Sequence, residues 1–231
     1  MTLLCIHGAG FTGRVFDAQR EIDSQFRAPN LPGHQSPGEP ASVDDFADYV
    51  EEYIKDQELD TIVLCGHSLG GAIALQLALR GLPQIQALVL LGSGARLRVA
   101  PQFMQGLQDD FESTAGKITS ALFADRTSPL AAEARRSFAV VGQAQTLRDF
   151  AACNSFDATA RLCTMHVPVL AMTGKHDVMT PPKYAQSLAA AVPDGSCIII
   201  EDAGHMVMQE RPAETNLALQ KFVTGLGLKI R

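Results

Sequence analysis

The sequence predicts an α/β fold in which a mostly parallel, doubly wound sheet has helices on both faces. Several short apolar runs recur along the chain, and none alternates polar with apolar residues, so both faces of each strand should be buried. Helical patterns separate these runs, which favours an open sheet with helical crossovers. The 231 residues are 46% hydrophobic and 19% charged, enough for one large domain or two small ones.

The strands are predicted where the apolar runs lie. These runs are residues 3–6, 61–65, 87–91, 167–172 and 196–200. Residues 25–31 are a candidate for a further strand, which brings the expected sheet to about six strands.

Four helices are predicted between and after the strands. Apolar residues recur at helical spacing over 42–57, which starts with an S-x-x-D pattern typical of a capping box. Residues 68–80 are apolar on nearly every side, so this helix should be deeply buried. A third helix is expected from Thr180 until shortly before Pro193, and a fourth over 212–224.

Residues 94–166 interrupt the alternation, because they contain no convincing strand and are predicted to form several short helices. The segment holds six of the eleven phenylalanines, and its eight basic and seven acidic residues sum to +1, against −7 for the remainder. Two interpretations are compatible: an ordinary helical insertion with its own small core, or a cap that shapes a substrate pocket. The expected organisation is a core domain, residues 1–93 and 167–231, with a helical cap, residues 94–166.

Composition excludes several classes of function. The net charge of −6, without any basic run, argues against a nucleic-acid partner. No apolar stretch approaches the ~18 residues of a membrane helix, and no signal peptide is recognised. The five cysteines are odd in number and lack metal-like spacing, so we expect a cytoplasmic protein without a metal or cofactor.

The stretch "VLCGHSLGGA", residues 63–72, places a serine on a glycine-rich turn between a strand and a helix. A nucleophilic serine on such a sharp turn needs glycines at 66 and 70, because a Cβ there would collide with the neighbouring strand and helix. Ser68 is therefore the candidate nucleophile.

Two further loops supply a candidate acid and a candidate base. Asp177 follows the strand at 167–172, and His205 follows the strand at 196–200. Because parallel strands bring their carboxyl ends to one edge of the sheet, Ser68, Asp177 and His205 should meet there. Asp202 is the competing acid, but it lies only three residues before His205, which makes alignment with the imidazole awkward.

The chain resembles esterase/lipase-type proteins of the α/β-hydrolase fold. The matching stretches, in the family's order, are "HGAG" (7–10), "LPGHQSPGEP" (31–40), "GHSLGG" (66–71), "GKHDVMTPP" (174–182) and "AGHMVMQERP" (203–212). The most similar group includes bacterial carboxylesterases, pimeloyl-carrier methyl esterases and cofactor-free lyases. The resemblance implies that Ser68, Asp177 and His205 act as nucleophile, acid and base.

Two departures from the family pattern stand out. The chain begins almost at once with the strand that normally comes third, so the usual leading hairpin is expected to be missing. Gln35 stands where the family usually has glycine, and the resemblance leaves its role open.

The implied chemistry is hydrolysis of carboxylic esters with short to medium acyl chains. His205 would take the proton of Ser68, and Asp177 would fix the tautomer of His205. The backbone N–H groups of Ala9 and Leu69 are the expected donors to the oxyanion. A carrier-linked methyl esterase, a cofactor-free lyase and a slow-turnover ligand receptor remain alternatives. The sequence also leaves open the oligomeric state and whether Arg96 and Arg98 bind an anionic substrate group.

Overall fold

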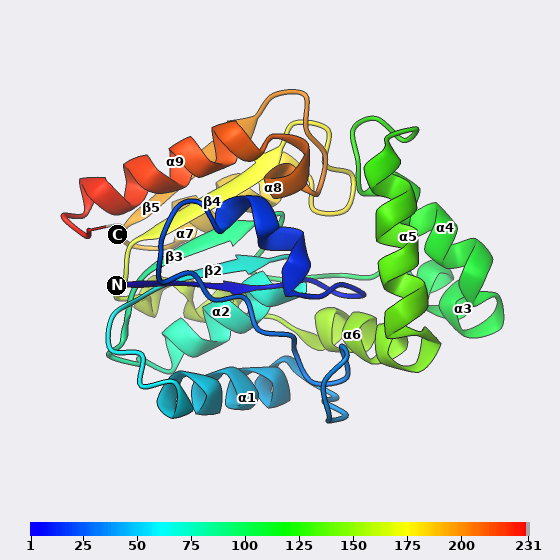
Figure 1. Ribbon diagram of the computed structural model, residues 1–231, viewed down its shortest axis with the longest axis horizontal. Helices are drawn as coiled ribbons and strands as arrows, with labels where there is room; N and C mark the ends of the chain where they lie inside the picture. Colours follow the sequence, from blue (N-terminus) through cyan, green and yellow to red (C-terminus); the bar gives the residue numbers. More distant parts are fainter. Residues whose placement is uncertain (230–231) are drawn as a thin grey trace.

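The computed structural model, which describes residues 1–229, contains one parallel sheet whose strands follow chain order (Figure 1). Its strands are β1 (Thr2–Ile6), β2 (Ile62–His67), β3 (Ile85–Leu91), β4 (Val169–Gly174) and β5 (Gly195–Ile200). Neighbours pair in parallel throughout, in the order β1-β2-β3-β4-β5. The predicted α/β fold and all five predicted apolar strands are confirmed.

The described residues contain five strands and not the expected six. Residues 25–31 run beside β1 but form only an isolated bridge, between Leu4 and Arg27. Two hydrogen bonds make this bridge: the Arg27 N–H to the Leu3 carbonyl, 2.9 Å, and the Cys5 N–H to the Arg27 carbonyl, 2.8 Å. Pro29 follows two residues later and has no N–H to continue the ladder, so the pairing stops there.

Helices cover both faces of the sheet, as predicted. On one face lie α1 (Val43–Asp56), α2 (Leu69–Leu79), α7 (Pro182–Ala191) and the short 3₁₀ helix η2 (Thr159–Thr164). The other face carries η1 (Gly13–Gln19), α8 (Val207–Glu210) and α9 (Pro212–Gly225). The crossovers through α2 and α7 both step in the same direction across the sheet. Right-handed connections therefore place both helices on one face.

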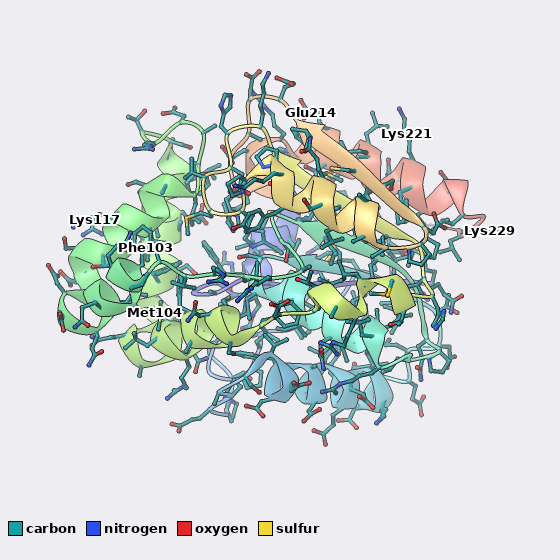
Figure 2. The ribbon with its side chains drawn as sticks, turned by 180° about the vertical axis from the view of Figure 1, so that it is seen from behind. Phe103, Met104, Lys117, Glu214, Lys221 and Lys229 are labelled. Carbon is teal, nitrogen blue, oxygen red and sulfur yellow. The ribbon has the colours of Figure 1, made fainter. Side chains whose placement is uncertain are left out.

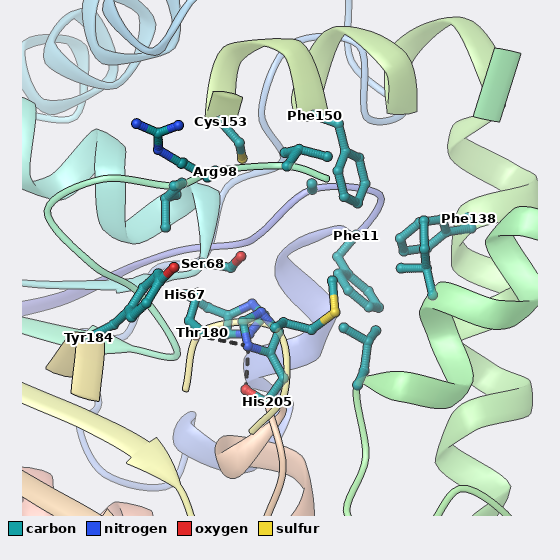
Figure 3. Close-up of a pocket in the computed structure, with 16 residues that line it drawn as sticks. Phe11, His67, Ser68, Arg98, Phe138, Phe150, Cys153, Thr180, Tyr184 and His205 are labelled. Carbon is teal, nitrogen blue, oxygen red and sulfur yellow. Dashed lines mark hydrogen bonds between the residues drawn. The ribbon is translucent and has the colours of Figure 1, made fainter. Parts of the chain in front are cut away.

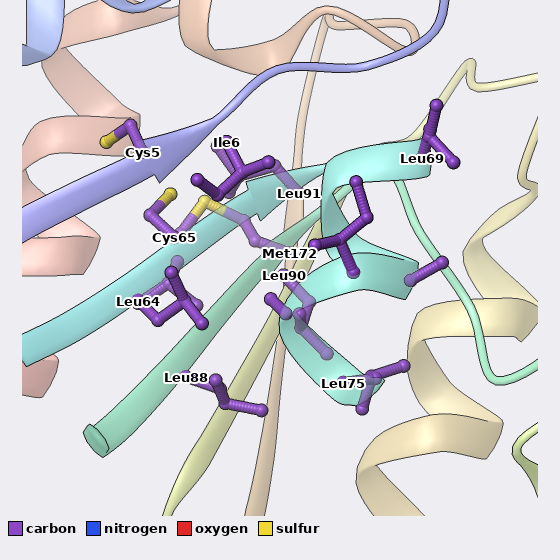
Figure 4. Close-up of a cluster of buried hydrophobic side chains, with 14 of the residues drawn as sticks. Cys5, Ile6, Leu64, Cys65, Leu69, Leu75, Leu88, Leu90, Leu91 and Met172 are labelled. Carbon is purple, nitrogen blue, oxygen red and sulfur yellow. The ribbon is translucent and has the colours of Figure 1, made fainter. Parts of the chain in front are cut away.

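Two of these helices begin and pack as their sequences predict. The Ser42 hydroxyl accepts from the Asp45 N–H, and the Asp45 carboxylate accepts from the Ser42 N–H, which completes the capping box of α1. Helix α2 is buried on most sides, and its Leu69 and Leu75 belong to the same cluster of buried hydrophobic side chains as the strand residues (Figure 4). The hydrophobic core therefore includes the layer between the sheet and α2, and it continues on the opposite face with residues of η1, α8 and α9.

Within residues 94–166, four α-helices lie beyond the carboxyl ends of the strands, whereas η2 near the end of the segment lies on the sheet face with α2 and α7 (Figure 1). The four α-helices are α3 (Pro101–Asp109), α4 (Phe111–Ala121), α5 (Pro129–Val141) and α6 (Gln143–Ser155). Phe103 and Lys117 mark the outer helices of this group in the rear view (Figure 2). The two ends of the segment meet: the Ala158 N–H donates to the Ala95 carbonyl at 2.8 Å, and Arg96 pairs with Asp157 at 3.2 Å.

Residues 1–229 can be examined for the membrane helices, metal sites and disulfides that were considered from the sequence. None of their helices combines the length and apolar character needed to cross a membrane. They also bring together no group of three or more His, Cys, Asp or Glu side chains suited to a metal ion. All five cysteines are free thiols.

Candidate active site

Ser68 occupies a strained turn between β2 and α2. Its φ of 52° and ψ of −113° lie in a region that non-glycine residues rarely adopt. The neighbouring strand end holds this turn, because the Ser68 N–H donates to the Leu91 carbonyl at 2.9 Å and the Ser93 hydroxyl donates to the Ser68 carbonyl at 2.9 Å. A strained serine held at both backbone polar groups presents its side chain in a fixed direction.

Glycines 66 and 70 are required for close packing, as the motif predicts. A Cβ on Gly66 would overlap the Gly70 carbonyl, and a Cβ on Gly70 would overlap the Ile6 carbonyl. Neither obstacle is a flexible side chain, so any larger residue would displace the turn from β1 and β2.

Asp177 and His205 form a buried hydrogen-bonded pair. The Nδ1 atom of His205 lies 2.8 Å from Oδ2 of Asp177. Asp177 also accepts bonds from the Thr173 and Thr180 hydroxyls, at 2.7 and 2.9 Å, and from the N–H groups of Met179 and Thr180, both at 2.8 Å. Burial alone would raise the pKa of Asp177, but the charge and hydrogen bond of His205 and these other donors outweigh it and lower the pKa to about 2.

The ionised state of Asp177 sets the tautomer of His205. A carboxylate only accepts hydrogen bonds, so the proton of the neutral imidazole sits on Nδ1. The Nε2 atom then keeps its lone pair. A general base needs this lone pair to accept a proton.

The competing acid, Asp202, lies apart from His205. Its side chain is 76% exposed and pairs with Arg211 at 3.5 Å. The end of β3 offers no alternative either, because Gly92 packs against the imidazole, and a Cβ there would lie 3.0 Å from Nδ1 of His205.

Ser68 and His205 line one apolar cavity of about 60 Å³ (Figure 3). Phe138 and Phe150 project toward it from α5 and α6, on the side opposite His205. The complete lining is Ala9, Phe11, His67, Ser68, Leu97, Arg98, Val99, Ile118, Leu122, Phe138, Phe150, Cys153, Met179, Thr180, Tyr184 and His205. Among residues 1–229, the Ser68 hydroxyl makes no hydrogen bond to His205, although both face this space.

The residues expected to donate to the oxyanion are Ala9 and Leu69. Ala9 lines the cavity, and Leu69 is the first residue of α2, with its side chain in the core (Figure 4). Neither N–H group donates to a protein acceptor within the described part of the chain.

The family model described as "Alpha/beta hydrolase family" matches residues 3–218, nearly the whole chain. The chain belongs to this family. It is 28% identical to the pimeloyl-[acyl-carrier protein] methyl ester esterase of Nitrosomonas europaea over 88% of each chain. It is 29% identical to the protein of that name from Neisseria meningitidis, over 96% of this chain and 93% of the relative.

Solved structures agree with the family match. A structure titled as a thermophilic esterase superposes with a TM-score of 0.87 at 32% identity, covering 98% of this chain and 90% of the other. The resemblance found in the sequence is confirmed at this level: the chain is an α/β hydrolase of the esterase type.

Two further histidines of this hydrolase brace the site. Nδ1 of His7 donates to the Gly8 carbonyl at 3.0 Å, and its Nε2 accepts from the Leu31 N–H at 2.9 Å. Burial, followed by the neighbouring His34, lowers the pKa of His7 to about 3. His67 lines the cavity, but its Nε2 faces the His205 carbonyl at 3.2 Å, and burial is the main cause that lowers its pKa well below the usual value.

Several residues at the site were not singled out from the sequence. The sequence pattern predicts only a helix start at Thr180 and only a loop residue at Thr173, just after the strand at 167–172, yet both hydroxyls donate to Asp177. A buried threonine in an otherwise apolar strand, "VLAMTG", was the available signal for Thr173. No local pattern marks Tyr184 or Met179 as lining residues.

Gln35, Arg96 and Arg98, whose roles the sequence left open, differ in their position relative to the cavity. Gln35 is exposed, has a φ of 62° and does not line the Ser68 cavity. Arg98 is also exposed and lines the cavity, whereas Arg96 is paired with Asp157.

Proposed function

We propose that this hydrolase cleaves carboxylic esters of short to medium acyl chain through an acyl-enzyme formed on Ser68. The observation that carries the proposal is the bond of His205 Nδ1 to the ionised Asp177, at the cavity that also holds the strained Ser68. Nucleophile, base and orienting acid are the three parts that serine-based acyl transfer requires.

In the acylation step, Nε2 of His205 takes the proton from Ser68 as Oγ attacks the ester carbonyl. The carbonyl oxygen becomes negative, and the Ala9 and Leu69 N–H groups stabilise it; each such donor is typically worth ~3 kcal/mol. His205 then gives its proton to the departing alcohol. Water attacks the acyl-enzyme by the same route in reverse, with Asp177 stabilising the imidazolium at both stages.

The cavity dimensions favour a small acyl group. Its volume of about 60 Å³ is well below the ~300–1,000 Å³ of a drug-sized ligand pocket. Longer chains would require α5 and α6 to move outward. We therefore assign residues 94–166 as the cap and residues 1–93 and 167–231 as the core, supported by the contact between the two ends of the segment and by the phenylalanines it contributes to the cavity.

A carrier-linked methyl ester is the second candidate substrate, because two relatives bear that name. The exposed Arg98 at the cavity would suit an acidic carrier or its phosphate group. The overall charge of +1 on the segment gives this candidate only weak support. Comparing kcat/KM for one methyl ester, free and carrier-linked, at low and high salt separates the two candidates, since charge-guided docking weakens with salt.

We also propose a reducing, cytoplasmic setting. Cys5 and Cys65 lie in register on adjacent strands and remain free thiols, as expected where disulfides are rare.

The experiment is a panel of p-nitrophenyl esters from C2 to C12, measured on the wild type and on Ser68→Ala. The wild type should turn over the short esters, and Ser68→Ala should lose several orders of magnitude in kcat while remaining folded. A fluorophosphonate should label Ser68 stoichiometrically. Labelling at another residue, or uniformly slow turnover on every ester, would contradict the proposal.

A further inference from the structure

Gly10, the residue after Ala9, is held at both of its backbone polar groups by helices of residues 94–166. Its N–H donates to Oδ2 of Asp149 on α6 at 2.9 Å, and its carbonyl accepts from the Ser137 hydroxyl on α5 at 3.0 Å. The Phe138 ring covers the same residue, because a Cβ on Gly10 would lie 2.5 Å from the ring. Gly10 has a φ of +73°, so glycine meets both the conformational and the packing requirement.

Asp149 is a charged group in an unusual place. Its side chain is 0% exposed, and besides Gly10 it accepts from Nε2 of His34 at 2.8 Å and from the Gln145 amide at 2.8 Å. A buried carboxylate is unfavourable unless several donors converge on it. Two of the three donors, the Gly10 N–H and Nε2 of His34, belong to loops outside residues 94–166. The Asp149 carboxylate therefore connects α6 to the core by hydrogen bonds, and its contacts are not confined to the cap.

The preceding peptide is anchored from the core side. The Gly8 carbonyl accepts from Nδ1 of His7 at 3.0 Å and from the Phe11 N–H at 3.3 Å. Because the Gly8–Ala9 peptide is trans and planar, the Ala9 N–H points away from that carbonyl. The direction of this N–H therefore depends on three successive peptides. His7 fixes the Gly8–Ala9 peptide through its carbonyl, Asp149 fixes the Ala9–Gly10 peptide through its N–H, and Ser137 fixes the Gly10–Phe11 peptide through its carbonyl.

We propose that Asp149 and Ser137 are positioning residues that hold the Ala9 N–H in the direction of the developing oxyanion. The oxyanion site is then complete only while α5 and α6 are seated on the core. This inference rests on the proposed esterase function and adds to it a requirement that the cap contributes to transition-state stabilisation, not only to substrate fit.

The test compares Asp149→Ala, Asp149→Asn and Ser137→Ala with a control in the same helix, Gln143→Ala. Gln143 bonds only the Leu107 and Gln108 carbonyls, both at 2.9 Å and both within the segment 94–166. Losing one oxyanion donor typically lowers kcat by ~10²–10³-fold, so Asp149→Ala should lose about 100-fold in kcat with little change in KM. Asp149→Asn keeps an acceptor oxygen and should lose about 10-fold or less, Ser137→Ala should lose a few-fold, and Gln143→Ala should match the wild type.

A second readout separates positioning from a purely structural role. Butylboronic acid forms a tetrahedral adduct with a catalytic serine, whereas butyrate is a planar product. The inhibition constant for the boronic acid should rise in parallel with the loss of kcat/KM across the variants, and that for butyrate should stay constant. If Asp149→Ala does not fold, the milder Asp149→Asn and Ser137→Ala variants carry the same comparison.

Four outcomes would overturn the inference. Variants as active as the wild type would overturn it alone, and so would losses confined to KM or equal weakening of boronic acid and butyrate. A wild type with no esterase activity and no labelling of Ser68 would overturn the proposed function and this inference together.

Discussion

Replacing Asp177 by asparagine tests the site most directly, because the substitution keeps the shape of the side chain while it removes the negative charge and changes the hydrogen bonding. Oδ1 accepts from two backbone N–H groups, those of Met179 and Thr180, which cannot reverse direction. Oδ2 accepts from two hydroxyls, which can rotate, and from His205. The amide oxygen of asparagine must therefore face the backbone, and its NH₂ group must face His205.

This orientation reverses the tautomer of His205. An NH₂ group donates, so Nδ1 of His205 would have to accept, and its proton would move to Nε2. Nε2 could then no longer take the proton of Ser68. The analogous change in serine proteases lowers kcat by ~10⁴-fold, which corresponds to about 5 kcal/mol of lost transition-state stabilisation.

The assay is steady-state hydrolysis of p-nitrophenyl butyrate, with circular dichroism to verify folding. Asp202→Asn is the matched control, because Asp202 is exposed and bonded to Arg211, so its kcat should stay within about twofold of the wild type, as expected for a surface change. If Asp177→Asn kept more than a tenth of the activity, or if Asp202→Asn were the more damaging change, the assignment of Asp177 would be wrong.

Stability and chain length supply three further tests. The pKa of His7 is about 3 in the folded state, against 6.5 in the unfolded state, so between these values only the unfolded state binds the proton and acid favours unfolding. The free energy of unfolding should therefore fall by up to about 5 kcal/mol from pH 7 to pH 3. Urea denaturation at several pH values measures this fall, and a free energy that does not change with pH would contradict it. Gln35→Gly removes a left-handed glutamine and should stabilise by up to about 1 kcal/mol without changing kcat; a lower Tm would contradict it. Each methylene that fits the cavity should raise kcat/KM up to about fourfold until the space is full; a monotonic rise to C12 would show that the cap opens.

The sequence alone determined the parallel sheet and the residues to examine at its edge. Uniformly apolar runs are a local property, and they predict strands buried on both faces wherever they occur. Because such strands share one direction, the loops bearing Ser68, Asp177 and His205 had to open on the same side of the sheet. The only strand expectation that failed, residues 25–31, failed at Pro29, where a missing N–H ended the pairing.

Only the tertiary structure decided how the site is held. The donors around Asp177 come from β4 and from the loop before α7, and Gly10 meets Asp149 across 139 residues of sequence. Helical periodicity predicts that α5 and α6 have buried faces but not which core loop each face will meet. That choice depends on how residues 94–166 as a whole pack against the sheet edge, where a buried carboxylate is stable only with all its donors in place.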